Sequence, residues 1–356
     1  MIAIVVTARP SYARIKTVLE GLDQLRAPFT LYVCASALLS KYGRVIDVIR
    51  RDGYDPVEVW ASCEHNELVG GCLTTASLTS ALAVLFARDR PSVVVTIADR
   101  KETLATAIAA SYQHIPLFHL LSTEHSGSID EKVRAAVAAL ADYRHDPLQD
   151  GCPSVDLAVR AQYDPPVTLD ELGGSGSLLD LSRPFVVLLQ HPVSNEPEAA
   201  AQLEQTMIAL TGLPLPVLAF WPGEESGAEA SSKALRQLKE NYLGNHAWHF
   251  VRSAAPARFY RLLDQSVCLV GNSSVGVREA SAIGTPVVNI GSRQTGRVRA
   301  ANVLDVGHDV GDIRQAVQAQ IVHGVYAPSA LYGDGHAGMR VALWLQEIAH
   351  GRSTTH

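Results

Sequence analysis

The stretch IAIVVTARPSYARIKTVLEGL (2–22) decides the predicted architecture of this chain. Its first part, Ile2 to Thr7, is a continuous apolar and β-branched run, which is typical of a parallel strand buried on both faces. A short polar loop follows, and apolar residues then recur at helical spacing from about Tyr12 to Leu25. Strand, loop and helix in this order predict the start of a doubly wound α/β sheet.

The same alternation continues in two series, which are separated by a stretch dense in glycine, serine and proline. Apolar runs alternate with helical stretches through residues 1–165 and again through 184–335. The intervening residues 166–183 include GGSGS, which indicates a linker. We therefore predict two Rossmann-like domains, with a C-terminal helix and tail, 336–356, packing back on the first. Ligands of such sheets bind beyond the carboxyl ends of the strands, so two facing domains predict a ligand cleft between them.

Length, charge and cysteine usage restrict the class of protein. A length of 356 residues favours two domains, and the net charge of −6 argues against nucleic acid as a partner. The five cysteines are scattered without metal-ligand spacing, which predicts free thiols and no metal. The N-terminus lacks the features of a signal peptide, and the apolar runs are much shorter than a membrane span. We expect a cytoplasmic protein without a membrane partner.

Polar residues gather directly after the predicted strands of both series. Each one alone has a structural explanation, because serines cap helices and acidic residues in a first turn complement the helix dipole. Their recurrence at strand ends in both series favours a shared ligand site instead. In chain order these residues are Arg9, Asp99, Glu102, Glu124, His125, Asp130, Glu131, His191, Asn272, Ser273, Ser274, Arg293, Gln294 and Arg297.

The most informative string is GNSSVGVREA (271–280). Gly271 permits a tight turn or a close approach of the backbone. Ser273 and Ser274 bring hydroxyl and N–H groups to a helix start, which suits a phosphate. Glu279 lies further along the same helix, where a carboxylate suits two ribose hydroxyls. The loop after the first strand has no GxGxxG fingerprint, so we expect no bound NAD and no other cofactor.

Segments spread through most of the chain resemble the UDP-N-acetylglucosamine 2-epimerases, and within them the hydrolysing type of the sialic-acid pathway. This resemblance implies the GT-B fold, in which two Rossmann-like domains hold a UDP-sugar between them. It also implies a homo-oligomer, with a dimer as the expected form. The matching segments are TARPSYARIKTVL (7–19), ADRKETLATAIAA (98–110), GSIDEKVRAAVAALADYRH (127–145), GCPSVDLA (151–158), HPVSNE (191–196) and GNSSVGVREASAIGTPVVNIGSRQTGRVRAANVLDV (271–306).

The resemblance implies a role for individual residues in binding the nucleotide sugar. Ser273, Ser274 and Glu279 match positions that hold the diphosphate and ribose. Arg9 matches a residue that approaches the diphosphate from the other domain. The nucleotide-sugar-binding residues implied in this way are Arg9, Ser273, Ser274, Gly276, Glu279, Arg293 and Arg297.

The reaction implied by the resemblance inverts carbon 2 of UDP-GlcNAc in amino-sugar biosynthesis. UDP leaves carbon 1 and a base removes the weakly acidic proton of carbon 2, which gives 2-acetamidoglucal. Addition of water then yields ManNAc and UDP, the hydrolysing outcome, whereas addition of UDP yields UDP-ManNAc. The catalytic residues implied are Asp99, Glu124, Asp130, Glu131 and His191.

One departure from the family pattern concerns the chemistry. The family commonly reads His-Ile-Glu-Gly-Gly-Glu where this chain has His-Leu-Leu-Ser-Thr-Glu (119–124), so Leu121 stands in the place of a carboxylate. Glu124 or His125 could take over its role. The alternatives are a relative acting on a different UDP-sugar, for instance in antibiotic assembly, and a UDP-sugar-binding protein without catalysis. A glycosyltransferase shares the fold but not the epimerase-like segments.

Overall fold

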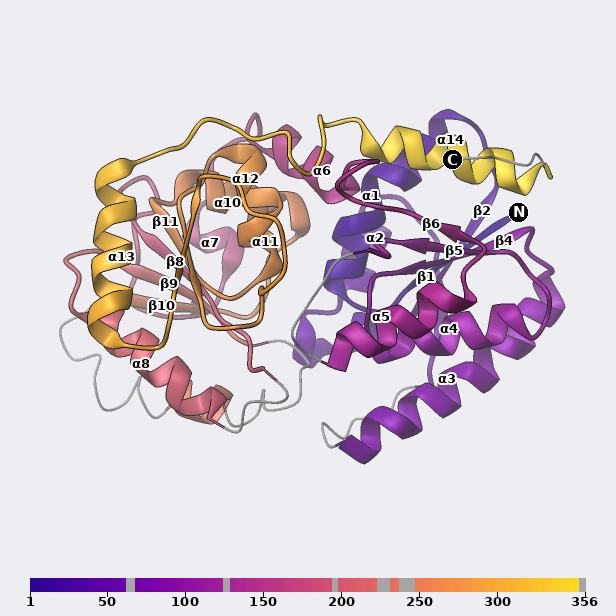
Figure 1. Ribbon diagram of the computed structural model, residues 1–356, viewed down its shortest axis with the longest axis horizontal. Coiled ribbons are helices and arrows are strands. Elements are labelled where there is room, and N and C mark those ends of the chain that lie inside the picture. Colours follow the sequence, from indigo (N-terminus) through magenta and orange to yellow (C-terminus); the bar gives the residue numbers. More distant parts are fainter. Residues whose placement is uncertain (62–67, 124–128, 194–197, 223–230, 237–246, 352–356) are drawn as a thin grey trace. The chain divides into compact units, whose positions relative to one another are not determined.

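A computed structural model describes residues 1–61, 68–123, 129–193, 198–222, 231–236 and 247–351 (Figure 1). The chain divides into two compact units. The first, called the first domain below, contains the N-terminal part of the chain up to Leu157 and the C-terminal stretch from Tyr332. The second, called the second domain, is Ala158–Leu331.

The first domain is built on a six-stranded sheet in the order β3-β2-β1-β4-β5-β6, and the strand pairs are parallel. Every residue of β1 and β4 is buried, as the continuous apolar runs predict for central parallel strands. Its elements are β1 (Ile2–Val6), α1 (Arg9–Gln24), β2 (Phe29–Cys34), η1 (Ala35–Leu38), η2 (Ser40–Tyr42), α2 (Val45–Arg51), β3 (Val57–Val59), α3 (Leu68–Asp89), β4 (Val93–Ile97), α4 (Lys101–Ser111), β5 (Leu117–Leu120), α5 (Ile129–Leu140), β6 (Tyr143–Arg144) and α14 (Ala337–Ala349), and α6 (Pro153–Ala161) leads into the second domain.

The C-terminal helix α14 belongs to the first domain and packs on α1. A Cβ atom at Gly21 would lie 2.8 Å from the Cβ of Ala342, so the two helices approach closely only because residue 21 is glycine. The buried carboxylate of Asp156 accepts hydrogen bonds from the N–H groups of Ala337 at 3.1 Å and Gly338 at 2.6 Å. These bonds satisfy N–H groups at the start of α14 and fix the helix to the domain.

Helix α3 runs from Leu68 to Asp89. By length and composition alone, Val69–Asp89 could cross a membrane, with a mean hydropathy of 1.7 and 28% of the window buried. The expectation that every apolar run is much shorter than a span is therefore wrong for this helix. The finding is weak evidence for a span, because helices of soluble cores pass the same test. Leu78, Leu82 and Phe86 of α3 point into the core of the first domain.

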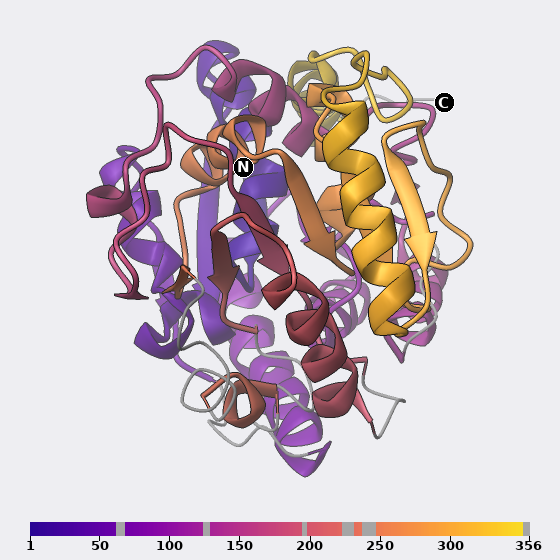
Figure 2. The ribbon, with the colours of Figure 1, turned by 90° about the vertical axis from the view of Figure 1, so that its left-hand side faces the viewer.

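The second domain contains a seven-stranded sheet in the order β13-β12-β11-β8-β9-β10-β7, parallel except for the edge strand β7, which pairs antiparallel with β10. Figure 2 shows α8 and α13 over one face of this sheet, where their apolar residues join the core. Its elements are α7 (Leu169–Leu172), β7 (Ser175–Gly176), β8 (Val186–Leu189), α8 (Ala199–Thr211), β9 (Val217–Phe220), β10 (Trp248–Val251), α10 (Pro256–Gln265), β11 (Cys268–Gly271), α11 (Ser274–Val277), α12 (Glu279–Ile283), β12 (Val287–Ile290), β13 (Val303–Val306) and α13 (Val310–His323).

The segment expected as a linker, 166–183, is part of the second domain and forms α7 and β7. A Cβ at Gly174 would collide with the carbonyl oxygen of Phe250, and the φ of +108° there favours glycine. The ring of His249 lies 2.8 Å from the Gly173 carbonyl oxygen and 2.9 Å from that of Ser177. The glycines therefore allow this segment to pair closely with β10 at the sheet edge. A linker would have the same glycine-rich composition, so composition alone does not separate the two cases.

The two parallel sheets confirm the prediction of two Rossmann-like domains. In each, the first strand lies between the second and the fourth, counting only parallel strands. The chain reverses its winding direction there, between β1 and β4 in the first domain and between β8 and β11 in the second. Ligands of doubly wound sheets bind at these switch points, beyond the carboxyl ends of the strands. A ligand cleft between the domains stays a prediction.

Candidate active site

The switch point of the first domain carries the predicted residues Arg9 and Asp99. Arg9 is half-buried and begins α1 directly after β1, and Pro10 in the first turn suits a helix start. Asp99 follows β4, and its carboxylate pairs with the guanidinium of Arg134 on α5. Arg134 is only 3% exposed. A buried cation against this carboxylate holds it in one place, because charge-assisted bonds of this kind are strong and directional.

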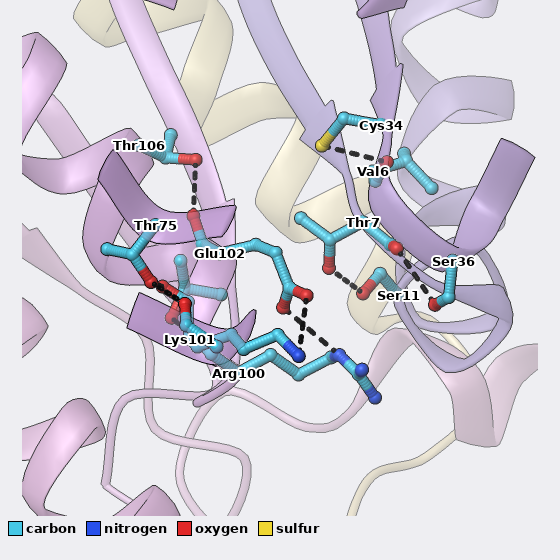
Figure 3. A network of polar contacts seen from close by, with 12 residues as sticks. Val6, Thr7, Ser11, Cys34, Ser36, Thr75, Arg100, Lys101, Glu102 and Thr106 are labelled. Carbon is cyan, nitrogen blue, oxygen red and sulfur yellow. Dashed lines mark hydrogen bonds and ion pairs between the residues drawn. The ribbon is translucent and has the colours of Figure 1, made fainter. Parts of the chain in front are cut away.

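A cluster of hydroxyl and charged groups from the first domain is drawn in Figure 3. The hydroxyls of Thr7 and Ser11 are 3.2 Å apart at the end of β1. Glu102, in the first turn of α4, has no exposed surface, and its carboxylate lies 3.3 Å from Nε of Arg100 and 3.9 Å from Nζ of Lys101. Glu102 is therefore a buried carboxylate next to two cations at the strand-end edge. It is not among the predicted catalytic residues.

The other predicted catalytic residues of the first domain lie at the start of α5. Asp130 is half-buried and Glu131 is exposed. Asp130 precedes Arg134 by one helical turn, so both lie on the same side of α5. Arg134 was not predicted, although the spacing of Asp130 and Arg134 in the sequence is a signal for it. Glu124 and His125 lie outside the described residues.

Two strand-end turns of the first domain have an uncommon backbone. Ala98 follows β4 and Leu121 follows β5, and each has a φ of +63°. Such a conformation costs about 1–2 kcal/mol for a residue other than glycine. Leu121, which stands where the family has a carboxylate, is fully buried. Its side chain therefore belongs to the core in this structure.

Two buried histidines contact these turns. Nε2 of His119 lies 2.6 Å from the carbonyl oxygen of Ala98, and Nδ1 of His145 accepts the N–H of Leu121 at 3.3 Å. Burial lowers the pKa of His119 to about 4, because the charged imidazolium would lose its hydration. Burial lowers the pKa of His145 to about 4 as well. Both rings are therefore neutral near pH 7.

In the second domain, Asn272 connects three strand-end loops. Its side chain donates to the carbonyl oxygen of His191 at 2.8 Å and accepts the N–H of His191 at 2.7 Å. Its own carbonyl oxygen accepts from Nε2 of Gln294 at 2.7 Å and from Nη1 of Arg293 at 3.2 Å. The predicted residues His191 and Arg293 are thus brought together at the switch point. A Cβ at Gly271 would collide with the Leu189 carbonyl oxygen, so β8 and β11 approach closely here.

The serines of the GNSSVG string flank the start of α11. Ser273 precedes the helix and Ser274 begins it, and both are half-buried. Oγ of Ser274 accepts a hydrogen bond from Nη2 of Arg278 at 3.1 Å. Glu279 begins α12, is buried and lies 3.7 Å from the same guanidinium nitrogen. The sequence analysis did not predict Arg278. Its guanidinium is buried next to the carboxylate of Glu279, so the two opposite charges lie together away from water.

Gly276 and Arg297 complete the predicted binding set. A Cβ at Gly276 would lie 2.8 Å from Cγ1 of Val287, so this glycine lets α11 approach β12. Arg297 is half-buried in the loop after β12. Its carbonyl oxygen accepts from Nη1 of Arg299 at 2.6 Å, and Arg299 also forms an ion pair of 2.7 Å with Asp305. Arg299 therefore stabilises the shape of the loop that carries the predicted arginines.

No three His, Cys, Asp or Glu side chains come together as metal ligands in the described part of the chain. A cavity of about 420 Å³ lies in the first domain, lined by residues that include Asp23, Phe29 and Tyr54. Phe29 begins β2, so this cavity is at the amino end of the sheet. The polar residues described above lie at the carboxyl ends, which is the edge where ligands of this fold bind.

Known proteins are similar to this chain over nearly its whole length. A hydrolysing UDP-N,N'-diacetylbacillosamine 2-epimerase of Legionella pneumophila is 26% identical, covering 96% of this chain and 94% of that protein. A UDP-N-acetylglucosamine 2-epimerase of Neisseria meningitidis is 22% identical, covering 86% and 83%. The crystal structure of Methanocaldococcus jannaschii UDP-GlcNAc 2-epimerase with UDP-GlcNAc and UDP superposes with a TM-score of 0.79 at 13% identity, covering 97% and 99%, which shows the shared fold.

The sequence profile of a single family covers most of the chain. It matches residues 64–150 and 162–346, which include the strand-end residues of both switch points apart from those that follow β1. The chain belongs to the UDP-N-acetylglucosamine 2-epimerase family.

Proposed function

We propose that this protein is a hydrolysing UDP-GlcNAc 2-epimerase, which converts UDP-GlcNAc and water to ManNAc and UDP. The observation that carries the proposal is the division of chemistry between the two switch points. The first domain presents Asp99, held by buried Arg134, and the second presents Arg293 and the hydroxyls of Ser273 and Ser274. Proton transfer needs the former and a departing diphosphate needs the latter.

The proposed reaction has two stages. In the first, a carboxylate removes the proton of carbon 2 while the bond from carbon 1 to UDP breaks, which leaves 2-acetamidoglucal. In the second, the oxygen of water adds to carbon 1. A proton adds to carbon 2 on the face opposite to the one from which the first proton was removed. Proton transfer is assigned to a group of residues that matches the family, namely Asp99, Glu124, Asp130, Glu131 and His191.

The nucleotide is proposed to bind through cations, hydroxyls and backbone N–H groups. Arginine suits phosphate because its guanidinium donates in a planar fork. Neither stage requires a redox cofactor, since no electrons are exchanged. The residues assigned to UDP-sugar binding are Arg9, Ser273, Ser274, Gly276, Glu279, Arg293 and Arg297.

A second candidate is the same reaction on a UDP-sugar other than UDP-GlcNAc. Two observations favour it. Leu121 is a buried leucine in the place of a family carboxylate, and the relative from Legionella is named for UDP-N,N'-diacetylbacillosamine. The two candidates share the nucleotide and differ in the sugar, so they predict equal binding of UDP and different turnover.

The experiment that tests both candidates follows each nucleotide sugar by proton NMR in deuterated water. Release of UDP with deuterium at carbon 2 of free ManNAc supports the first candidate. Turnover of the diacetylated sugar at a rate at least tenfold higher supports the second. UDP-ManNAc without release of UDP contradicts the hydrolysing outcome. Saturable UDP binding with neither turnover nor deuterium uptake contradicts an epimerase and indicates a binding protein.

We also propose a cytoplasmic homodimer that associates through the outer face of α3. Val69 is 65% exposed, Leu73 49% and Val84 69%, and no charged residue occurs from 68 to 87. The exposed face of α3 also carries Ser77 and Ser80 but no charge before Arg88, and an uncharged helix face with several apolar side chains is normally covered. A face about 30 Å long with no charge of its own suits a second copy of itself in a two-fold contact.

Sedimentation equilibrium tests the proposed dimer. Val84→Lys places a charge on the face and is expected to shift the mass toward the monomer. Val322→Lys is the matched control, because Val322 is 87% exposed on α13 of the second domain and its substitution leaves the α3 face intact. A wild-type monomer, or an unchanged dimer in Val84→Lys, contradicts association through α3.

A further inference from the structure

The backbone N–H and carbonyl groups of the turns at Ala98 and Leu121 bond to residues of the next strand in the sheet. The N–H of Ala98 donates to the Leu120 carbonyl oxygen at 2.9 Å, and its carbonyl oxygen lies 2.6 Å from Nε2 of His119. Both partners belong to β5. The turn after β4 is therefore held from β5, and its conformation depends on the ring of His119.

The turn after β5 is held in the same manner from the end of β6. The N–H of Leu121 donates to Nδ1 of His145 at 3.3 Å, and the N–H of Ser122 donates to the His145 carbonyl oxygen at 2.9 Å. The N–H of His145 donates in turn to the carbonyl oxygen of His119 at 3.1 Å. The two histidines thus form one connected set of bonds across three strand ends.

The geometry requires the Nε2–H tautomer of both rings, although different nitrogens make the two bonds. His119 faces a carbonyl oxygen, which only accepts, so its Nε2 carries the proton. His145 faces an N–H group, which only donates, so its Nδ1 is unprotonated. Each ring is fully buried, and burial keeps it neutral, which the bond to His145 requires. A cationic side chain could not replace His145 in this contact, because it has no lone pair to accept the N–H of Leu121.

We propose that His119 and His145 are positioning residues for the acid–base edge of the first domain. They fix the left-handed turns at Ala98 and Leu121, and through Ala98 they fix the place of Asp99 against Arg134. Residue 121 takes part in this arrangement through its backbone N–H, which donates to His145. Its side chain is not needed for that contact. The consequence for catalysis rests on the proposed function, whereas the consequence for the backbone does not.

Substitution of each histidine by glutamine or asparagine tests the proposal, because each amide side chain replaces only one of the two ring nitrogens. The amide of glutamine reaches the position of Nε2 and that of asparagine the position of Nδ1. We expect His119→Gln to keep turnover within about threefold of wild type and His119→Asn to lower kcat about 100-fold, with a KM change below threefold, because a misplaced catalytic group costs about that much. For His145 the order is reversed, so that His145→Asn is active and His145→Gln is impaired.

A glycine at residue 98 provides a rescue. Glycine adopts positive φ without strain, so Ala98→Gly in the His119→Asn background is expected to restore kcat about tenfold. His249→Leu is the matched control, because His249 is a buried histidine that contacts two carbonyl oxygens at the far edge of the second domain. It should lower the melting temperature without lowering kcat. No rescue by glycine, or equal kcat for the asparagine and glutamine variants, overturns the proposal.

A crystal structure of His119→Asn separates this inference from the proposed function. We expect residue 98 to leave the left-handed region and the Asp99–Arg134 pair to open. If wild type turns over no nucleotide sugar, the proposed function fails, but this structural result still decides the inference. Residue 98 unchanged at positive φ in the variant overturns it.

Discussion

The first and second domains wind six parallel strands in the same order, yet their switch points carry different groups. In the first, the carboxylates of Asp99 and Glu102 lie against cations, and buried histidines hold the backbone. In the second, Asn272 holds the backbone of three loops, and arginines and serines follow the strands. The shared winding determines where a ligand can bind, whereas the loop residues determine what each edge can do.

The proposed function places proton transfer mainly in the first domain and nucleotide binding mainly in the second, with His191 and Arg9 as the exceptions, and Asp99→Asn tests this with the largest effect. The variant keeps the size of the side chain and removes the charge that pairs with Arg134. We expect turnover to fall about 1,000-fold, within the range for loss of a general base. The dissociation constant for UDP, measured by calorimetry, should change less than about threefold, since binding is assigned to the other edge.

Asp47→Asn is the control for this variant, because Asp47 is a half-exposed residue of α2 that pairs only with Arg44 three residues before it among the contacts described. Turnover and binding should both match wild type. If Asp99→Asn weakens UDP binding as strongly as turnover, the division of labour between the two edges is wrong.

The second domain depends on its edge strand, which Gly174→Ala is expected to break. The added Cβ collides with the Phe250 carbonyl oxygen at a φ of +108°, so we expect a loss of about 3 kcal/mol in the free energy of unfolding. Gly173→Ala is the matched neighbour, because its Cβ would meet no atom within 4 Å. At its φ of +60° and ψ of −154°, which glycine adopts almost exclusively, strain without a collision should cost about 2 kcal/mol. Equal losses in urea unfolding would restore the interpretation of this segment as a linker.

The strands were the most predictable part of the fold, because central parallel strands are buried on both faces and their sequences are continuous apolar runs. Strand β13 has no such run: it lies at the edge of its sheet, and its four residues are only partly buried or exposed. The GGSGS stretch was misread because glycine serves both flexible and crowded backbone. Its pairing with β10 depends on residues more than 70 positions away, which local composition does not contain.

The site was predictable as positions after strands, but not as a set of contacts. Asp99 and His191 follow apolar runs, so their location at strand ends was visible in the sequence. Arg134 and Arg278 are almost fully buried, and sequence patterns assign arginine to the surface. The function of Asn272 as a clamp was equally hidden, since its partner loop lies 81 residues earlier in the chain.

Asn272, which holds the loop after β8, gives a smaller expected effect and tests the assignment of nucleotide binding to the second domain. Asn272→Ala leaves the N–H and carbonyl groups of His191 without these bonds, so the loop after β8 should lose its fixed shape. We expect the dissociation constant for UDP to rise about 30-fold, which corresponds to about 2 kcal/mol. Turnover at saturating substrate should fall much less than for Asp99→Asn, because Asp99 is untouched, although the loosened loop carries His191.

Asn302→Ala is the control for this clamp, because Asn302 is also buried in the second domain and bonds a carbonyl oxygen, that of Thr285, at 2.9 Å. It should lower stability similarly while UDP binding stays unchanged. Equal UDP affinity in the two variants would show that the backbone held by Asn272 does not shape the binding edge.

The smallest expected effect is a pH dependence of stability that comes from the first domain. Folded His119 has a pKa of about 4, whereas an unfolded histidine titrates near about 6.5, so the unfolded chain binds a proton that the folded chain does not. Stability is therefore complete above that higher value and declines as the pH falls toward the lower one. Lowering the pH from about 7 to about 5.5 should cost about 1 kcal/mol through this ring.

Urea unfolding of His119→Gln across the same pH range isolates this contribution. Glutamine does not titrate, so the difference in unfolding free energy between wild type and variant should shrink by about 1 kcal/mol as the pH falls over that range. His145 contributes in the same direction, because burial lowers its pKa as well. A difference that stays constant with pH would mean that His119 has the same pKa in the folded protein as in the unfolded chain, which contradicts a ring kept neutral by burial.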